Sequence, residues 1–175
     1  MDNLVISGIS ISIESGNGTV TQRYSPRNSG GTIYLANGGI LVQFLAGNVG
    51  KVLTEISGSD GWAPPALLGL DFTIPHVVKC IQSRAVSGTS TTISISSKRR
   101  SDTGYSPKGY AIVSNSLVST PLVMDVDEAT LTAVAEADSY EVHYWPEITA
   151  MLTLNNEILD LSGPSFGWTL TCTEV

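Results

Sequence analysis

The residues that could carry out chemistry in this sequence do not form a complete catalytic set. Residues 163–167, Gly-Pro-Ser-Phe-Gly, match the letters G-x-S-x-G of a hydrolase nucleophile elbow. That elbow joins a strand to a helix, whereas the residues after Ser165 alternate like a strand, and Pro164 fits the sharp turn badly. A Gly-Pro turn that enters a strand explains this segment better. We therefore predict no catalytic residue and no enzymatic activity.

Histidine, cysteine and acidic residues also predict no metal site. His76 and Cys80 lie four residues apart on a predicted strand, which places their side chains about 13 Å apart, too far to share one ion. Glu141 and His143 share one face of another predicted strand, and a solvated or interface-facing row is the ordinary explanation. The run Asp125-Val126-Asp127-Glu128 lacks the glycine and the distal glutamate of a calcium loop. We expect neither metal nor cofactor.

Lys98, Arg99 and Arg100 form the one cluster of positive charge. Three cations give only weak affinity for a phosphate backbone, so we do not expect nucleic acid as a partner. Residues 1–108 hold all nine Lys and Arg and six acids, a net charge of +3, whereas residues 109–175 hold ten acids and a net charge of −10. The cluster is either a solvated loop tip or part of an arm that docks on an acidic neighbour. In a head-to-tail contact, copies of the chain would pair the two signs.

One tryptophan lies in a loop expected over residues 57–65. Trp62 is either an interface anchor, a role in which tryptophan is enriched, or a lid that folds back over the core. Trp62 beside Asp60 is also the one aromatic and polar pair that would suit a carbohydrate-binding module. The interface candidates are Trp62, Lys98, Arg99, Arg100 and Tyr105.

Stretches of alternating apolar and polar residues, separated by Gly, Pro and Asn turns, predict an all-β protein, either a β-sandwich or a partly closed barrel. In the last stretch, the alternation predicts that Phe166, Trp168, Leu170 and Cys172 face inward. The expected strands are 4–13, 19–24, 32–36, 40–46, 51–57, 67–74, 76–86, 110–118, 122–126, 140–145, 148–154, 158–161 and 166–175.

Two segments depart from this pattern. Residues 127–138 are the one helix candidate, although Thr130 and Thr132 alternate with apolar neighbours and leave a strand open. Residues 87–109 hold too few apolar side chains to bury a core face. We predict that they form a projecting arm, a long loop or hairpin whose order depends on neighbouring subunits. The whole chain, 1–175, is then expected to be a single β domain that carries this arm.

The composition favours assembly. Apolar residues make up 42% of the chain and support a real core, whereas charged residues make up only 14%, well below the usual quarter. Burying charge is costly, so a lightly charged surface is easily covered by other subunits. Cys80 and Cys172 are predicted to be free buried thiols, which suits synthesis in a reducing cytosol. The sequence shows neither a secretory signal nor a membrane-spanning stretch.

The C-terminal third resembles structural proteins of tailed-bacteriophage virions, in particular small tail and baseplate components. The resemblance rests on residues 140–146, Tyr-Glu-Val-His-Tyr-Trp-Pro, and on the closing residues 166–175, Phe-Gly-Trp-Thr-Leu-Thr-Cys-Thr-Glu-Val. It implies a β-sandwich with a flanking helix, ring formation, commonly six-fold, and loops that reach adjacent virion proteins. It also implies synthesis in the bacterial host cytoplasm and a final place in the virion. Tube, tube initiator, terminator and baseplate remain open as positions.

Two other classes of function fit the same residues. A capsid decoration protein would also be β-rich and acidic, but it would form trimers or bind as a monomer. A carbohydrate-binding or host-recognition module would need exposed aromatic rings beside polar groups. We expect no membrane partner in any of these cases.

Overall fold

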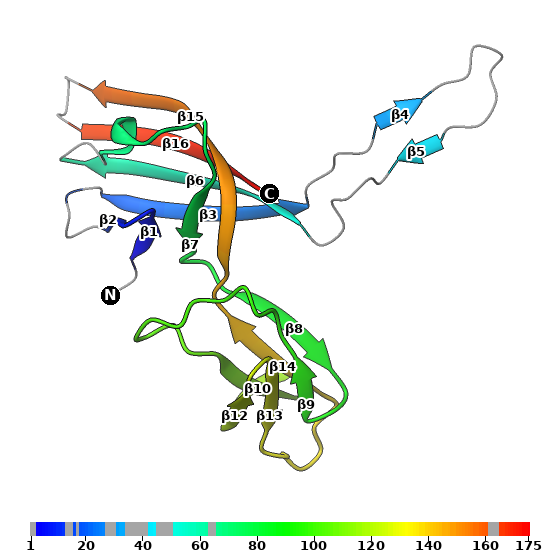
Figure 1. The fold of residues 1–175 in the computed structure, drawn as a ribbon. Coiled ribbons are helices and arrows are strands. Elements are labelled where there is room, and N and C mark those ends of the chain that lie inside the picture. The colour runs from blue at the N-terminus through cyan, green and yellow to red at the C-terminus, as the bar shows by residue number, and fades with distance from the viewer. Residues whose placement is uncertain are drawn as a thin grey trace. The chain divides into compact units, whose positions relative to one another are not determined.

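In a computed structural model, the chain consists almost wholly of antiparallel strands (Figure 1). The structure describes residues 3–12, 16, 18–26, 31–33, 42–44, 51–62, 66–160 and 165–175. The predicted all-β class is confirmed, and no sheet in the described part of the chain closes into a barrel. The contacts of the chain divide it into two compact units, Met1–Ser12 with Val77–Ile148 and Ile13–His76 with Thr149–Val175.

The first unit contains two antiparallel sheets that share a core. One sheet has the order β11-β10-β14-β8 and the other has the order β12-β13-β9. A short ribbon, β2-β1-β7, belongs to the same unit, apart from the first residue of β7. The strands are β1 (Leu4–Ile6), β2 (Ile9–Ile11), β7 (His76–Lys79), β8 (Arg84–Gly88), β9 (Thr92–Ser94), β10 (Lys108–Val113), β11 (Ser116–Thr120), β12 (Leu122–Asp125), β13 (Glu128–Leu131) and β14 (Ser139–Tyr144).

Side chains from both sheets build the core of the first unit, as in a two-layer sandwich. The two sheets contribute alternate residues, since the intervening side chains of each strand face outward. The buried members are Ile93, Ile95, Ala111, Ala129, Leu131, Tyr140, Val142 and Tyr144.

Residues 127–138 form no helix, and the strand alternative is the correct one for their first part. Ala129 and Leu131 are buried while Thr130 between them is exposed, which is the period of a strand. Further along, Glu136 has a φ of +60°, a left-handed conformation that a regular helix does not contain.

The prediction of a projecting arm over residues 87–109 is wrong, because the segment packs into the first unit. Ile93 and Ile95 belong to the shared core, and Arg100 and Tyr105 are buried. The segment has few apolar residues, yet it is held in the first unit by these four side chains. The count of apolar residues did not reveal that the segment is buried, because one of the four buried side chains is an arginine.

The second unit contains an antiparallel sheet with the order β15-β16-β6-β3. A separate two-stranded ribbon pairs β4 with β5, and a short 3-10 helix follows β6. The elements are β3 (Thr19–Pro26), β4 (Gly31–Ile33), β5 (Val42–Phe44), β6 (Val52–Gly61), the 3-10 helix Leu67–Gly69, β15 (Glu147–Asp160, of which residues 149–160 belong to this unit) and β16 (Ser165–Glu174).

Two predicted strands are interrupted by local turns. Ser7 and Gly8 have φ values of 45° and 87°, so the predicted strand 4–13 folds into the β1–β2 hairpin through a two-residue turn. The strand predicted over 67–74 does not form. Asp71 instead accepts hydrogen bonds from the Thr73 backbone N–H (2.9 Å) and hydroxyl (2.6 Å), which closes a turn.

The inward face of β16 is confirmed for three of its four residues. Trp168, Leu170 and Cys172 are buried, whereas Phe166 is only half-buried near the end of the sheet. Trp168 packs against Gly58 on the adjacent strand, where a Cβ atom would lie 2.1 Å from the indole nitrogen. The large indole therefore requires a residue without a side chain opposite it.

We expect Trp168→Ala to lower the free energy of unfolding by about 3–5 kcal/mol, because it leaves a large cavity in the second unit. Denaturant unfolding monitored by circular dichroism measures this loss. Thr173→Ala, on the opposite face of the same strand, serves as the control and should cost less than about 1 kcal/mol. Equal stability of the Trp168 variant and the parent would show that this face does not form the core.

Candidate interaction site

Arg100, one of the predicted interface cations, is buried in the first unit with 2% of its surface exposed. It lies in the irregular segment between β9 and β10, and its backbone N–H donates to the carbonyl of Trp145 at 2.8 Å. The adjacent residue, Arg99, forms a β-bridge with Pro146. These backbone contacts attach the segment to the chain just after β14.

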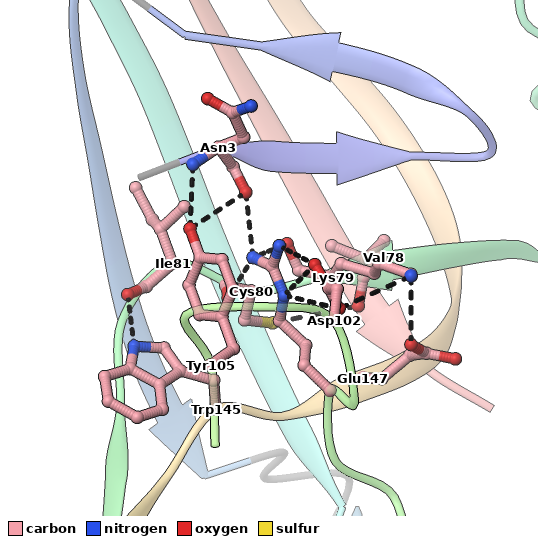
Figure 2. Close-up of polar contacts among 10 residues, drawn as sticks. Asn3, Val78, Lys79, Cys80, Ile81, Asp102, Tyr105, Trp145 and Glu147 are labelled. Carbon is pink, nitrogen blue, oxygen red and sulfur yellow. Dashed lines mark hydrogen bonds and ion pairs between the residues drawn. The ribbon is translucent and has the colours of Figure 1, made fainter. Parts of the chain in front are cut away.

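Acceptors surround the Arg100 guanidinium. The residues that supply them are Asn3, Lys79, Cys80 and Asp102, all labelled in Figure 2. Its Nη1 donates to the carbonyl oxygens of Asn3 (2.8 Å), Cys80 (2.9 Å) and, more weakly, Lys79 (3.4 Å). Its Nε and Nη2 donate to the carboxylate of Asp102 in a fork geometry. Such a fork uses the planar donors of arginine fully, and lysine could not reproduce it.

Tyr105 lies against the same guanidinium, whose central carbon is 3.3 Å from the ring centroid. The Tyr105 hydroxyl accepts a hydrogen bond from the Asn3 backbone N–H at 2.8 Å. Its ring meets Trp145 edge to face at 5.6 Å, and the Trp145 indole N–H donates to the Ile81 carbonyl at 3.0 Å. Both polar ends of these aromatic side chains are therefore satisfied inside the unit.

Asp102 is the counter-ion of this buried arginine cluster, which we define as Asn3, Lys79, Arg100, Asp102, Tyr105 and Trp145. The hydrogen bonds from Arg100 lower the pKa of Asp102 to about 2, and the charges of Arg100 and Lys79 act in the same direction. Lys79 lies 3.5 Å from Asp102 and 3.7 Å from Glu147. The charged groups of the cluster pair with one another, so the cluster is a structural centre of the first unit.

The remaining predicted cations have different positions. Arg99 donates to the carboxylate of Asp127 at 2.6 Å, to the carbonyl of Ser96 at 2.8 Å and to the carbonyl of Val126. The side chain of Lys98 is exposed. Arg99 and Arg100 each bind an acid of their own chain, Asp127 and Asp102, and the docking of this basic cluster on an adjacent subunit stays a prediction.

Trp62 lies in the second unit and is exposed, with 73% of its surface accessible. The interpretation in which it folds back over the core is therefore wrong. Its backbone N–H donates to the carbonyl of Gly16 at 2.8 Å, which holds the residue at the end of β6.

Two apolar residues near the end of β15 are exposed on opposite faces of the sheet, because they are consecutive in the strand. Ile158 is 57% and Leu159 is 48% exposed. Leu159 pairs with Phe166, and Phe166 pairs with Gly61, so all of these residues lie at one end of the sheet (Figure 1). We call Trp62, Ile158 and Leu159 the apolar end. It is the candidate interaction site of the second unit.

The outer face of the β8-β14-β10 sheet carries a row of residues that sequence reasoning regarded as ordinary. His143 lies 3.2 Å from the carboxylate of Glu141, which also accepts a hydrogen bond from the Ser87 hydroxyl at 3.2 Å. The His143 ring lies against the Tyr110 ring with a centroid distance of 4.6 Å and a tilt of 46° between the ring planes. Tyr110 could have been found only by knowing the strand register, since it is 33 residues away from His143 in the chain.

Other predictions concern single residues. Cys80 and Cys172 are buried and form no disulfide, as predicted. Within the described ranges, no group of three metal-binding side chains occurs. Gly163 and Pro164 of the G-x-S-x-G segment lie outside the described residues, and Ser165 begins β16. No helix in the described chain has the length and apolar character needed to cross a membrane.

Comparison with known proteins gives no relative: no protein-family model matches the chain, and neither do any curated proteins or solved structures.

We expect Arg100→Met to lower the free energy of unfolding by about 2–4 kcal/mol, because three carbonyls and a carboxylate lose a buried donor. Arg100→Lys should recover only part of the loss, since an ammonium cannot form the fork to Asp102. Urea unfolding measures both effects. Lys98→Met, two residues away on an exposed side chain, is the matched control and should change stability by less than about 0.5 kcal/mol. A loss no larger than that of the control would contradict the assigned role.

The depressed pKa of Asp102 predicts an acid-dependent loss of stability. Ionised Asp102 stabilises the folded state above its ordinary pKa of 3.8, and this contribution is lost as the pH falls from there towards about 2. The parent should therefore be more stable than Asp102→Asn at pH 6, and the difference should shrink between pH 4 and pH 2. Urea midpoints measured across this range test it, with Asp60→Asn as control. A difference that stays constant with pH would refute the linkage.

Proposed function

We propose that this chain is a structural component of a tailed-bacteriophage virion and acts by self-assembly, as a ring-forming protein of the tail or baseplate. The observation that carries the proposal is the apolar end of the second unit. Three large apolar side chains, Trp62, Ile158 and Leu159, are exposed at this end of the sheet, with Ile158 and Leu159 on its opposite faces. An exposed group of this kind marks a surface that a partner covers.

The composition of the chain supports another copy or a neighbouring virion protein as that partner. Charged residues make up only 14% of the sequence, so the surface around the apolar end can be covered at little desolvation cost. Tryptophan is the residue most enriched at the centres of protein interfaces. The residues that resemble tail and baseplate proteins lie largely on β14 and β16, and Phe166 of β16 lies beside Leu159. These points support assembly through the end of the β15-β16-β6-β3 sheet that carries the apolar end.

The proposal is tested by the oligomeric state of the purified chain. We expect rings or stacked rings in negative-stain images, and a particle mass several times that of the monomer in light scattering. Trimers would instead support a capsid decoration protein. A chain that stays monomeric at every concentration tested would refute self-assembly.

Trp62→Ser should weaken this assembly by at least about tenfold, because it removes the largest exposed apolar side chain of the apolar end. The dissociation constant from sedimentation velocity measures the effect. Val126→Ser, a similarly exposed apolar residue in the first unit, is the matched control and should leave the constant unchanged. An unchanged constant for Trp62→Ser, with folding intact by circular dichroism, would contradict the role of the apolar end.

A carbohydrate-binding module is a second candidate, favoured by the outer face of the first unit. Tyr110 and His143 offer two adjacent, half-exposed rings, and Glu141 and Ser87 place polar groups near them. A glycan-array signal that disappears in Tyr110→Ala, while the parent stays monomeric, would favour this candidate over the virion component.

A further inference from the structure

Strand β11 (Ser116–Thr120) lies at the edge of the β11-β10-β14-β8 sheet. It is joined to β10 by a two-residue turn, in which Ser114 and Asn115 have φ values of 49° and 62°. The residues that close the turn are Val113 and Ser116. This is the tight hairpin in which both turn residues are left-handed, and its length determines which backbone groups face β10.

In such a hairpin the closing pair exchanges both hydrogen bonds, and bonded and unbonded pairs then alternate along the strands. Val118 opposite Ala111 is therefore a bonded pair, whereas Leu117 opposite Ile112 and Ser119 opposite Tyr110 are not. Leu117 and Ser119 thus direct their backbone N–H and C=O groups away from β10. Neither residue takes part in the backbone hydrogen bonds that the described chain makes outside its strand ladders.

This edge lacks the usual protection against pairing with another chain. Protected edges carry charges, prolines or bulges. The edge strand β3 contains Arg23 and Pro26, and β12 contains Asp125. The sequence of β11, Ser-Leu-Val-Ser-Thr, has no charge, and Leu117 and Val118 are 55% and 41% exposed.

We propose that β11 pairs with β11 of a second copy of this chain, antiparallel and about a two-fold axis at Val118. Leu117 then lies opposite the partner's Ser119, and Ser119 opposite the partner's Leu117. The four residues exchange four backbone hydrogen bonds, and Val118 faces its own counterpart between them. This inference rests on the proposed self-assembly and names one surface that produces it.

Two features select this partner and this register. The turn at Ser114–Asn115 ends the available edge on one side, and Pro121, which has no N–H, ends it on the other. Only the register centred on Val118 uses both outward-facing residues of each strand. A two-fold contact places identical surfaces against each other, which would oppose like charges elsewhere on this acidic chain. An uncharged strand avoids that repulsion.

A cysteine at the axis tests the register directly. In an unbonded antiparallel pair the Cα atoms lie about 4.5 Å apart, which a disulfide can span. Val118→Cys should therefore form a covalent dimer under mild oxidation, seen as a doubled mass on non-reducing gels. Leu117→Cys is the matched control. It should not cross-link, because the partner's Ser119 lies opposite it. The native cysteines are buried in both variants.

Two further variants test whether the edge contributes to assembly. Leu117→Lys adds a charge to the edge, and Ser119→Pro removes an outward N–H without removing a hydrogen bond to β10. Each should halve the particle mass in sedimentation velocity, while Thr130→Lys, exposed on β13, should not. Circular dichroism confirms that each variant folds.

The outcomes separate this inference from the proposed function. One outcome refutes pairing through β11 and leaves self-assembly standing. In that outcome the parent assembles, the folded edge variants keep the particle mass of the parent, and Val118→Cys fails to cross-link. If the parent is monomeric at every concentration and Val118→Cys does not cross-link, both proposals fail. Selective cross-linking at residue 118 together with halved masses would support the pairing.

Discussion

The first unit depends on one desolvated guanidinium. Arg100 satisfies the carbonyls of Asn3, Lys79 and Cys80, which come from two segments far apart in the chain, and it binds Asp102 on its own segment. Taking a charge out of water is costly, and here the cost is offset by acceptors placed around all sides of one planar group. The irregular segment between β9 and β10 is thus held by polar contacts where a conventional loop would need apolar ones.

This interaction explains where sequence reasoning succeeded and where it failed. Alternation correctly indicated the all-β class and three of the four inward residues of β16, because a period of two follows directly from strand geometry. It failed over 67–74, where no strand forms. The arm over 87–109 was wrong because Arg100 was counted as a surface charge. Its burial depends on carbonyl oxygens supplied by distant residues. Every residue type has a main-chain carbonyl, so the sequence does not indicate which of them will accept hydrogen bonds from a buried arginine.

Local turns show a second limit of prediction from the sequence. Turns at Ser7–Gly8 and Ser114–Asn115 require residues in the left-handed conformation, and the residue types there permit such turns without demanding them.

The exposed residues at the end of the second unit's sheet were identified from the sequence only in part. Trp62 directly follows β6, and the loop predicted over 57–65 is wrong for residues 57–61, which belong to that strand. The exposure of Trp62 supports the role proposed for it. Ile158 and Leu159 were missed, because in a sequence they look like any other pair of core residues.

The second unit is discontinuous in the chain, and this has a consequence for how the protein is made. β6 forms its ladder with β16, whose residues lie more than a hundred positions later. A ribosome releases β8 to β14 of the first unit well before it releases β16, so the nascent chain holds β3 and β6 with one side of their sheet still open. Pairing across so long a separation is slow. We therefore expect synthesis to expose this half-built sheet for longer than any other part of the chain, which makes it the region most dependent on chaperones.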